Sequence, residues 1–281
     1  MEGLEEKTST SGIGVDCDAL QREARRQAPR ARARVFPIET SQGSWMVKRA
    51  APGRGLFRAL GGVALARFLT GQWSRLAPFR LGGSEQLYYE SRRLQRLREA
   101  GERVPQVVVE SGEHLILEDV GTHLTKVMRE LDTGGQDELL SDVAADLAAF
   151  HRRGHWHGGA QIRNHTLRDG MLYRIDFEDP LDRVMPLAAR QAMDLMLLVH
   201  STTAIKGRAL ASHHRLGKDL VERYFAVNPS PEVVAVIGSG WRMMAWMEST
   251  LRWARRWTGK DMRRLWVTMH VLGTGLSGRL C

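Results

Sequence analysis

Residues 156–167, WHGGAQIRNHTL, place a histidine and an asparagine seven positions apart in a polar segment that also carries two glycines. The preceding residues 136–154 have apolar side chains at helical spacing. The following residues 170–180, GMLYRIDFEDP, form a β-prone run that leads directly into a cluster of carboxylates beginning at Asp176. We therefore predict that the quoted stretch is a loop between a helix and a strand.

The rest of the chain has its strand-like runs early and its helical runs late. Residues 34–40 and 44–50 are β-prone and separated by SQG, which indicates a hairpin, and residues 106–112 and 114–120 predict two further strands. A helix is expected over 84–101, with Ser84 as its N-cap, and everything after residue 208 is helical in pattern. This order predicts an α+β fold.

We expect three regions along the chain. Residues 1–33 form a tail with a short helix, residues 34–120 form a β-rich lobe, and residues 121–281 form a helical lobe. The β-rich lobe contains an insertion, residues 55–83, that is rich in Leu, Phe, Trp, Gly and Arg. The insertion either packs on the body of the protein or touches a membrane surface.

Four features follow one another at informative spacing: Lys48 at a strand end, Glu90 on an apolar helix face, the loop from His157 to Asn164, and Asp176 just after a strand. Together with the segments MVKR, LILEDVG, IDFED and RQAMDLMLL, they resemble the protein-kinase-like superfamily over residues 34–200. The small atypical branch that contains bacterial lipopolysaccharide core kinases and RIO-type kinases is most similar. The resemblance implies a bilobal fold with a small β-rich N-lobe and a helical C-lobe.

The resemblance also implies ATP and Mg²⁺ as cofactors. Lys48 would contact the α and β phosphates, and Glu90 would hold Lys48 in place, which gives a reason for a carboxylate on an apolar helix face. Asp176 and Asn164 would bind Mg²⁺ through oxygen atoms, the ligands that hard cations prefer. Phosphoryl transfer needs this neutralisation of charge and alignment of the reacting oxygens.

Two further roles come with the same resemblance. The segment LILEDVG would be the strand and hinge that receive adenine, through backbone groups of Glu118 and Val120. Asp194, on the apolar helix that begins after residue 185, would anchor the backbone of the 156–164 loop.

The chain departs from the kinase pattern at two places. Gly159 stands where the family has its catalytic Asp, so the base is missing. His157 is an alternative base or a structural residue, and Arg163 would stabilise phosphate charge. A glycine-rich loop before Lys48 is also not evident. A pseudokinase, which binds nucleotide without catalysis, is therefore the alternative to an active kinase.

Each candidate also has an ordinary structural interpretation. Lys48 could be a solvated charge at a strand end, and Glu90 could pair with Arg93. Asp194 could pair with Arg190, one turn earlier on its helix. Asp176 could cap the turn before Pro180, and Asn164 could be a simple turn residue.

Composition limits the cellular setting. The chain has 281 residues, a formal net charge of +9 and two cysteines, Cys17 and Cys281, which excludes a disulfide framework. It has no long apolar run, and its N-terminus lacks the pattern of a secretion signal, so we expect a cytoplasmic protein. The charge favours an anionic glycolipid or protein acceptor and peripheral contact with the inner membrane face. Alternatively, Arg and Trp in residues 252–266 would bind nucleic acid or lipid.

Overall fold

The computed structural model describes residues 15–53, 60–64, 67, 82–205, 210–250 and 260–276. The protein is an α+β protein that divides into two compact units. The first contains residues 1–60, 76–122 and 166–180, and the second contains residues 61–75, 123–165 and 181–281. The main segment of the first unit ends at Thr122, close to the predicted change near residue 120, and residues 166–180 return to this unit.

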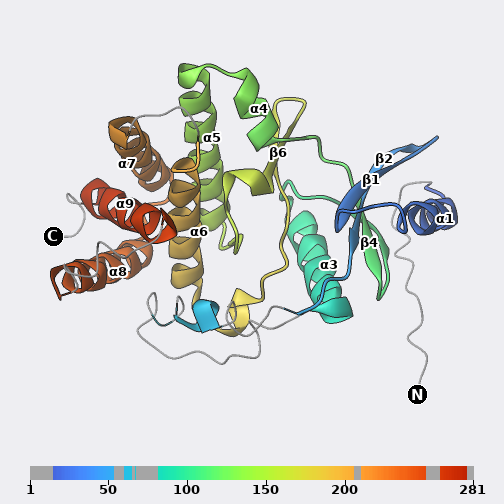
Figure 1. Ribbon diagram of the computed structural model, residues 1–281, viewed down its shortest axis with the longest axis horizontal. Coiled ribbons are helices and arrows are strands. Elements are labelled where there is room, and N and C mark those ends of the chain that lie inside the picture. Colours follow the sequence, from blue (N-terminus) through green and yellow to red (C-terminus); the bar gives the residue numbers. More distant parts are fainter. Residues whose placement is uncertain are drawn as a thin grey trace. The chain divides into compact units, whose positions relative to one another are not determined.

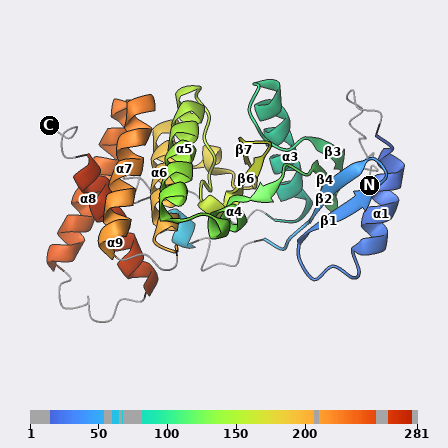
Figure 2. The same cartoon turned by 90° about the horizontal axis from the view of Figure 1, so that it is seen from above.

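An antiparallel sheet forms the centre of the first unit (Figures 1 and 2). Its strand order is β1-β2-β4-β3, with β1 Val35–Thr40, β2 Gly43–Arg49, β3 Val107–Glu110 and β4 His114–Glu118. The described helices of this unit are α1 Cys17–Gln27 and α3 Gly83–Glu99. The predicted N-cap Ser84 is wrong: it lies inside the helix, the N-cap is Gly82, and no side chain caps this end. The hairpin at SQG and the two later strands are therefore as predicted.

Strand alternation gives the two faces of this sheet different partners. Val47 of β2 lies opposite Ile116 of β4, and both belong to the apolar cluster that also contains Leu20 and Ala24 of α1. Neighbouring residues of a strand point to opposite faces. Lys48 therefore points away from the α1 cluster, toward the face where it meets α3.

A second, three-stranded sheet has the order β5-β6-β7, with β5 Thr122–His123, β6 His165–Arg168 and β7 Met171–Arg174. Asp169 and Gly170 join β6 to β7, and both have positive φ, 52° and 74°. A two-residue turn with positive φ at both positions matches the twist of a hairpin, and Asp-Gly is a favoured pair for it. This turn leads the chain into β7, which ends two residues before Asp176.

Helices make up most of the second unit (Figure 1). In chain order the elements are α4 Leu124–Glu130, α5 Thr133–Arg152, η2 Ile162–Asn164, η3 Leu181–Arg183, α6 Leu187–Thr202, α7 Leu210–Val227, α8 Pro231–Thr250 and α9 Lys260–Gly275. Asp132 caps α5 by accepting the N–H of Gly135. Side chains of α6 such as Leu195 and Leu198 are fully buried, as expected for an apolar helix inside a bundle.

Two sequence expectations fall largely outside the described residues. These are the insertion at 55–83 and the Arg/Trp segment at 252–266, of which only short parts are described. Among the helices that the structure describes, none combines the length and apolar character needed to cross a bilayer.

Candidate functional site

Lys48 is the centre of a cluster of charges in the first unit. Its side chain is almost completely buried, with an exposed fraction of 5%. Its Nζ lies 2.8 Å from Oε1 and 2.7 Å from Oε2 of Glu90, and 2.7 Å from Oδ1 of Asp176. The predicted contact between Lys48 and Glu90 is therefore present. Glu90 lies 42 positions and Asp176 lies 128 positions from the lysine in the chain. A solvated lysine at a strand end does not describe this side chain.

Glu90 comes from the middle of α3 and is 1% exposed. Its Oε1 also accepts the backbone N–H of Phe177 at 3.2 Å. Arg93 of the same helix has its guanidinium 5.0 Å from the centre of the Phe177 ring. Glu90 thus connects the lysine of β2 to the segment after β7, which is the role of a tether.

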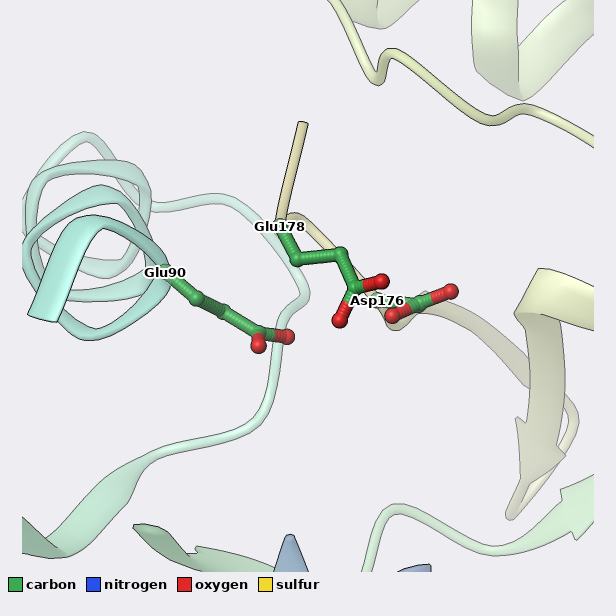
Figure 3. Close-up of side chains that lie close together, drawn as sticks. All are labelled: Glu90, Asp176 and Glu178. Carbon is green, nitrogen blue, oxygen red and sulfur yellow. The ribbon is translucent and has the colours of Figure 1, made fainter. Parts of the chain in front are cut away.

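Asp176 lies directly after β7 and has a positive φ of 71°. This left-handed conformation costs about 1–3 kcal/mol in a residue other than glycine and persists only where surrounding contacts hold it. Here the contacts are the ammonium of Lys48 on its carboxylate and the neighbouring Phe177 N–H on Glu90. Figure 3 shows the carboxylates of Glu90, Asp176 and Glu178 turned toward one another.

Glu178 is a third carboxylate of the cluster, and it was not among the candidate site residues chosen from sequence. Its Oε2 lies 3.1 Å from Nζ of Lys48 and 2.8 Å from Nη1 of Arg34. Its position in the carboxylate run of residues 176–179 was the available signal. Arg34 carried no sequence signal, because one arginine among the many before β1 gives no indication of its partner.

The charges of the cluster perturb one another. Burial alone would lower the pKa of Lys48, but Glu90, Asp176 and Glu178 outweigh it and raise this pKa well above its usual value. Complete burial raises the pKa of Glu90, and the ammonium of Lys48 opposes that shift. Lys48 is therefore a permanent cation, and the buried carboxylate of Glu90 depends on it.

The cluster has the chemistry to hold a divalent cation beside an anion. Carboxylate oxygens of Glu90, Asp176 and Glu178 lie within 4.8 Å of one another, and hard cations such as Mg²⁺ prefer such ligands. The three carboxylates face two cations, Lys48 and Arg34, which leaves one negative charge. A metal ion at Asp176 would draw its carboxylate away from Lys48, whose ammonium would then be available to an anionic ligand.

In the second unit, Asp194 of α6 anchors the quoted loop. The carboxylate is fully buried, with Oδ2 accepting the N–H of His157 at 2.5 Å and Oδ1 accepting the N–H of Gly158 at 2.7 Å. Arg190, the alternative partner, has its guanidinium 4.8 Å from the centre of the Trp156 ring. The anchoring role predicted for Asp194 is confirmed.

A series of buried hydrogen bonds fixes the side chain of Asp194 in its orientation. His151 of α5 has its Nε2 3.3 Å from Oδ2 of Asp194 and its Nδ1 2.7 Å from the hydroxyl of Tyr224 on α7. The same hydroxyl accepts from Nδ2 of Asn228 at 3.0 Å. These bonds fix the orientation of Asp194, so the position of the loop depends on three helices.

The loop itself orients His157 inward. His157 is fully buried, and its Nδ1 accepts the N–H of Gly159 at 3.1 Å. This placement favours the structural interpretation of His157 over its use as a base. Asn164 donates from Nδ2 to the carbonyl of Gly159 at 2.9 Å, and Arg163 is exposed, with its carbonyl 3.2 Å from Nδ1 of His123. Asn164 belongs to the second unit and Asp176 to the first, so their common metal site stays a prediction.

The two glycines of the loop differ in what they require. Gly158 has a φ of +92°, and an added Cβ would come within 2.8 Å of the Trp156 ring, so glycine is needed there. Gly159 lies outside the positive-φ region, and an added Cβ would be 3.3 Å from Nδ2 of Asn164. The backbone therefore does not require a glycine at the position where kinases carry their base.

The candidate hinge follows β4 in the first unit. The N–H of Glu118 donates to the carbonyl of Gln106, and the carbonyl of Val120 accepts the hydroxyl of Thr166 at 2.8 Å. The side chain of Glu118 pairs with Arg98 and Arg168, at 3.2 and 2.8 Å. Adenine binding by backbone groups of this segment stays a prediction.

No protein-family profile matches the chain, and a search of curated protein sequences finds no significant match.

Proposed function

We propose that this protein is an ATP- and Mg²⁺-dependent phosphotransferase of the kinase-like class, with a bilobal arrangement of its two units. The observation that carries the proposal is the buried ammonium of Lys48 between Glu90 and Asp176. Burying these charges costs desolvation free energy, and ionisable groups perturbed in this way cluster at functional sites. The anchoring of the 156–159 loop by Asp194 supports the same class.

The residues have distinct tasks in this proposal. Lys48 binds phosphate oxygens, Glu90 keeps its ammonium in place, and Asp176 binds the metal. Mg²⁺ supplies neutralisation of the charge that develops on the transferred phosphoryl group. Asn164 would complete the metal site, and backbone groups of the segment from Glu118 to Val120 would bind the adenine ring of ATP.

The acceptor in this proposal is an anionic molecule, a glycolipid or a protein, at the cytoplasmic face of the membrane. The net charge of +9 supports this choice, because a basic protein attracts anionic surfaces and substrates. Flotation with vesicles that contain anionic lipid, compared with neutral vesicles, tests the membrane contact. Binding to both alike, or to neither, contradicts it.

The decisive experiment measures nucleotide binding by the wild type and by carboxylate variants. Calorimetry with ATP and Mg²⁺ is expected to show binding by the wild type and a loss of at least tenfold in Asp176→Ala, since a charged ligand is removed. Asp179→Ala is the matched control, because Asp179 lies outside the three-carboxylate cluster. Equal binding by all three proteins, or by none, would overturn the proposal.

A nucleotide-binding protein without transfer activity is the second candidate. Gly159 offers no base, and the burial of His157 removes the nearest substitute. A general base contributes about 10²–10⁴-fold to a transfer rate, so its loss separates binding from catalysis. ATP binding that raises the melting temperature, without phosphate transfer to lipid, sugar or protein acceptors, would favour this candidate over an active kinase.

A further inference from the structure

The ammonium of Lys48 faces three carboxylates, as many as it has N–H donors. Its Nζ lies within 3.1 Å of four carboxylate oxygens, two from Glu90 and one each from Asp176 and Glu178. A protonated lysine offers three N–H donors. A phosphate oxygen can therefore bind Lys48 only when one of these carboxylates withdraws.

Glu178 is suited to withdraw, because a second cation already holds it. The same oxygen that faces Lys48, Oε2, accepts from Nη1 of Arg34 at 2.8 Å. Glu90 is more deeply buried and also accepts the N–H of Phe177, so it stays with Lys48. The side chain of Glu178 is only 15% exposed, and a carboxylate in such a place needs a partner when it loses one.

Arg34 is fixed to the two elements that carry the lysine and its tether. Its Nε donates to the carbonyl of Arg49, the residue after Lys48 in β2, at 2.9 Å. Its Nη2 lies 3.4 Å from Oε1 of Gln86, one turn before Glu90 in α3. A guanidinium presents several donors in a rigid fork, so Arg34 can keep these contacts and bind Glu178 at the same time.

We infer that Arg34 is a positioning residue that retains Glu178 when a polyphosphate takes its place on Lys48. The Arg34–Glu178 pair thereby sets how readily Lys48 exchanges carboxylate for phosphate. This inference rests on the proposed function, since it assumes that Lys48 binds phosphate. Without Arg34, Glu178 has Lys48 as its remaining cation in the cluster and competes more strongly with the incoming anion.

Binding of inorganic tripolyphosphate in the presence of EDTA tests the exchange without a metal, with calorimetry as the readout. Arg34→Met is expected to weaken binding about tenfold, the size of one charge-assisted hydrogen bond. Glu178→Gln is expected to tighten it by about threefold or more, because a competing charge is gone. The double variant Arg34→Met/Glu178→Gln is expected to bind within about twofold of Glu178→Gln.

The double variant separates positioning from simple structural support. If Arg34 only braced β2 and α3, its loss would weaken binding equally with or without the carboxylate of Glu178, and the inference would be overturned. Arg92→Met, an exposed arginine of α3, is the control for net charge and is expected to leave binding unchanged. If Arg34→Met does not fold, Glu178→Gln alone decides, since weaker tripolyphosphate binding contradicts the competition.

A second measurement needs no ligand and separates this inference from the proposed function. Urea unfolding of a double-mutant cycle gives the coupling free energy between Lys48→Met and Glu178→Gln. This coupling is expected to be larger in the Arg34→Met background than with Arg34 present, because Glu178 then has Lys48 as its cation. A wild type that binds neither ATP nor tripolyphosphate would remove the proposed function, yet this coupling would still be measurable. Coupling that is the same with Arg34 and with Met at this position overturns the inference.

Discussion

Replacing Asp194 with asparagine tests how the loop at residues 156–164 is held. The two carboxylate oxygens of Asp194 accept the N–H groups of His157 and Gly158, and Oδ2 also lies near Nε2 of His151. Asparagine has nearly the same shape but only one acceptor oxygen. Its NH₂ group would face a backbone N–H, so one buried donor would lose its acceptor.

The structure gives the size of this effect. A hydrogen bond to a charged group contributes about 1.5–3 kcal/mol, and a buried donor left unsatisfied costs a similar amount. One bond is lost and the other loses its charge, so we expect Asp194→Asn to lower the free energy of unfolding by about 3 kcal/mol. Urea unfolding followed by circular dichroism measures it. Asp142→Asn, an exposed change on α5, is expected to stay within about 0.5 kcal/mol of wild type.

The pH dependence of the stability difference between wild type and Asp194→Asn tests whether the charge of the carboxylate causes it. Burial alone would raise the pKa of Asp194, but the hydrogen bonds from His151 and from the N–H of His157 outweigh burial and lower the pKa. A carboxylate whose pKa is lower in the folded state stabilises the protein above its unfolded pKa, and this contribution disappears as pH falls through the folded pKa. The difference between wild type and Asp194→Asn is therefore expected to be constant above about pH 5 and to shrink below pH 4. A variant as stable as wild type, or a difference that grows in acid, would refute the reasoning.

Three other predictions concern single side chains. Lys48→Met should lower the free energy of unfolding by about 3–5 kcal/mol, as expected for a broken buried ion pair, whereas exposed Lys126→Met should not. Burial raises the pKa of Glu90, and Lys48 opposes this shift. Without Lys48 the folded protein loses stability as pH rises and Glu90 ionises, so the decrease in the free energy of unfolding caused by Lys48→Met should be greater at pH 8 than at pH 5 in urea unfolding. Gly158→Ala should cost about 1–3 kcal/mol, whereas Gly159→Ala should cost less than about 1 kcal/mol; equal costs would contradict the different backbone conformations. Gly159→Asp should increase ATP turnover by about 10²-fold if the missing base limits transfer, and unchanged turnover in a folded variant that binds ATP would exclude this explanation.

Local features of this protein were predictable because neighbouring residues decide them. The β-prone residues on both sides of SQG predicted the β1–β2 hairpin, and apolar side chains at helical spacing predicted α5. Glu90 was singled out because a carboxylate on an apolar helix face is costly to bury unless a cation meets it. Its pairing with Lys48 was an expectation from the resemblance to kinases.

Only the tertiary structure decided the membership of the site. Arg34 joins the cluster because the end of β2 and the first turn of α3 come together beside it, and nothing in its local sequence indicates this. The burial of His157 follows from the anchoring of its backbone by Asp194, which lies 37 residues later. The sequence by itself determined the strands and helices, because these depend on periodicity, and it indicated that Glu90 needs a cation, because burying an unpaired carboxylate is costly. The packing of distant segments decided which other charges surround Lys48, because contacts at long separation leave no periodic trace in the chain.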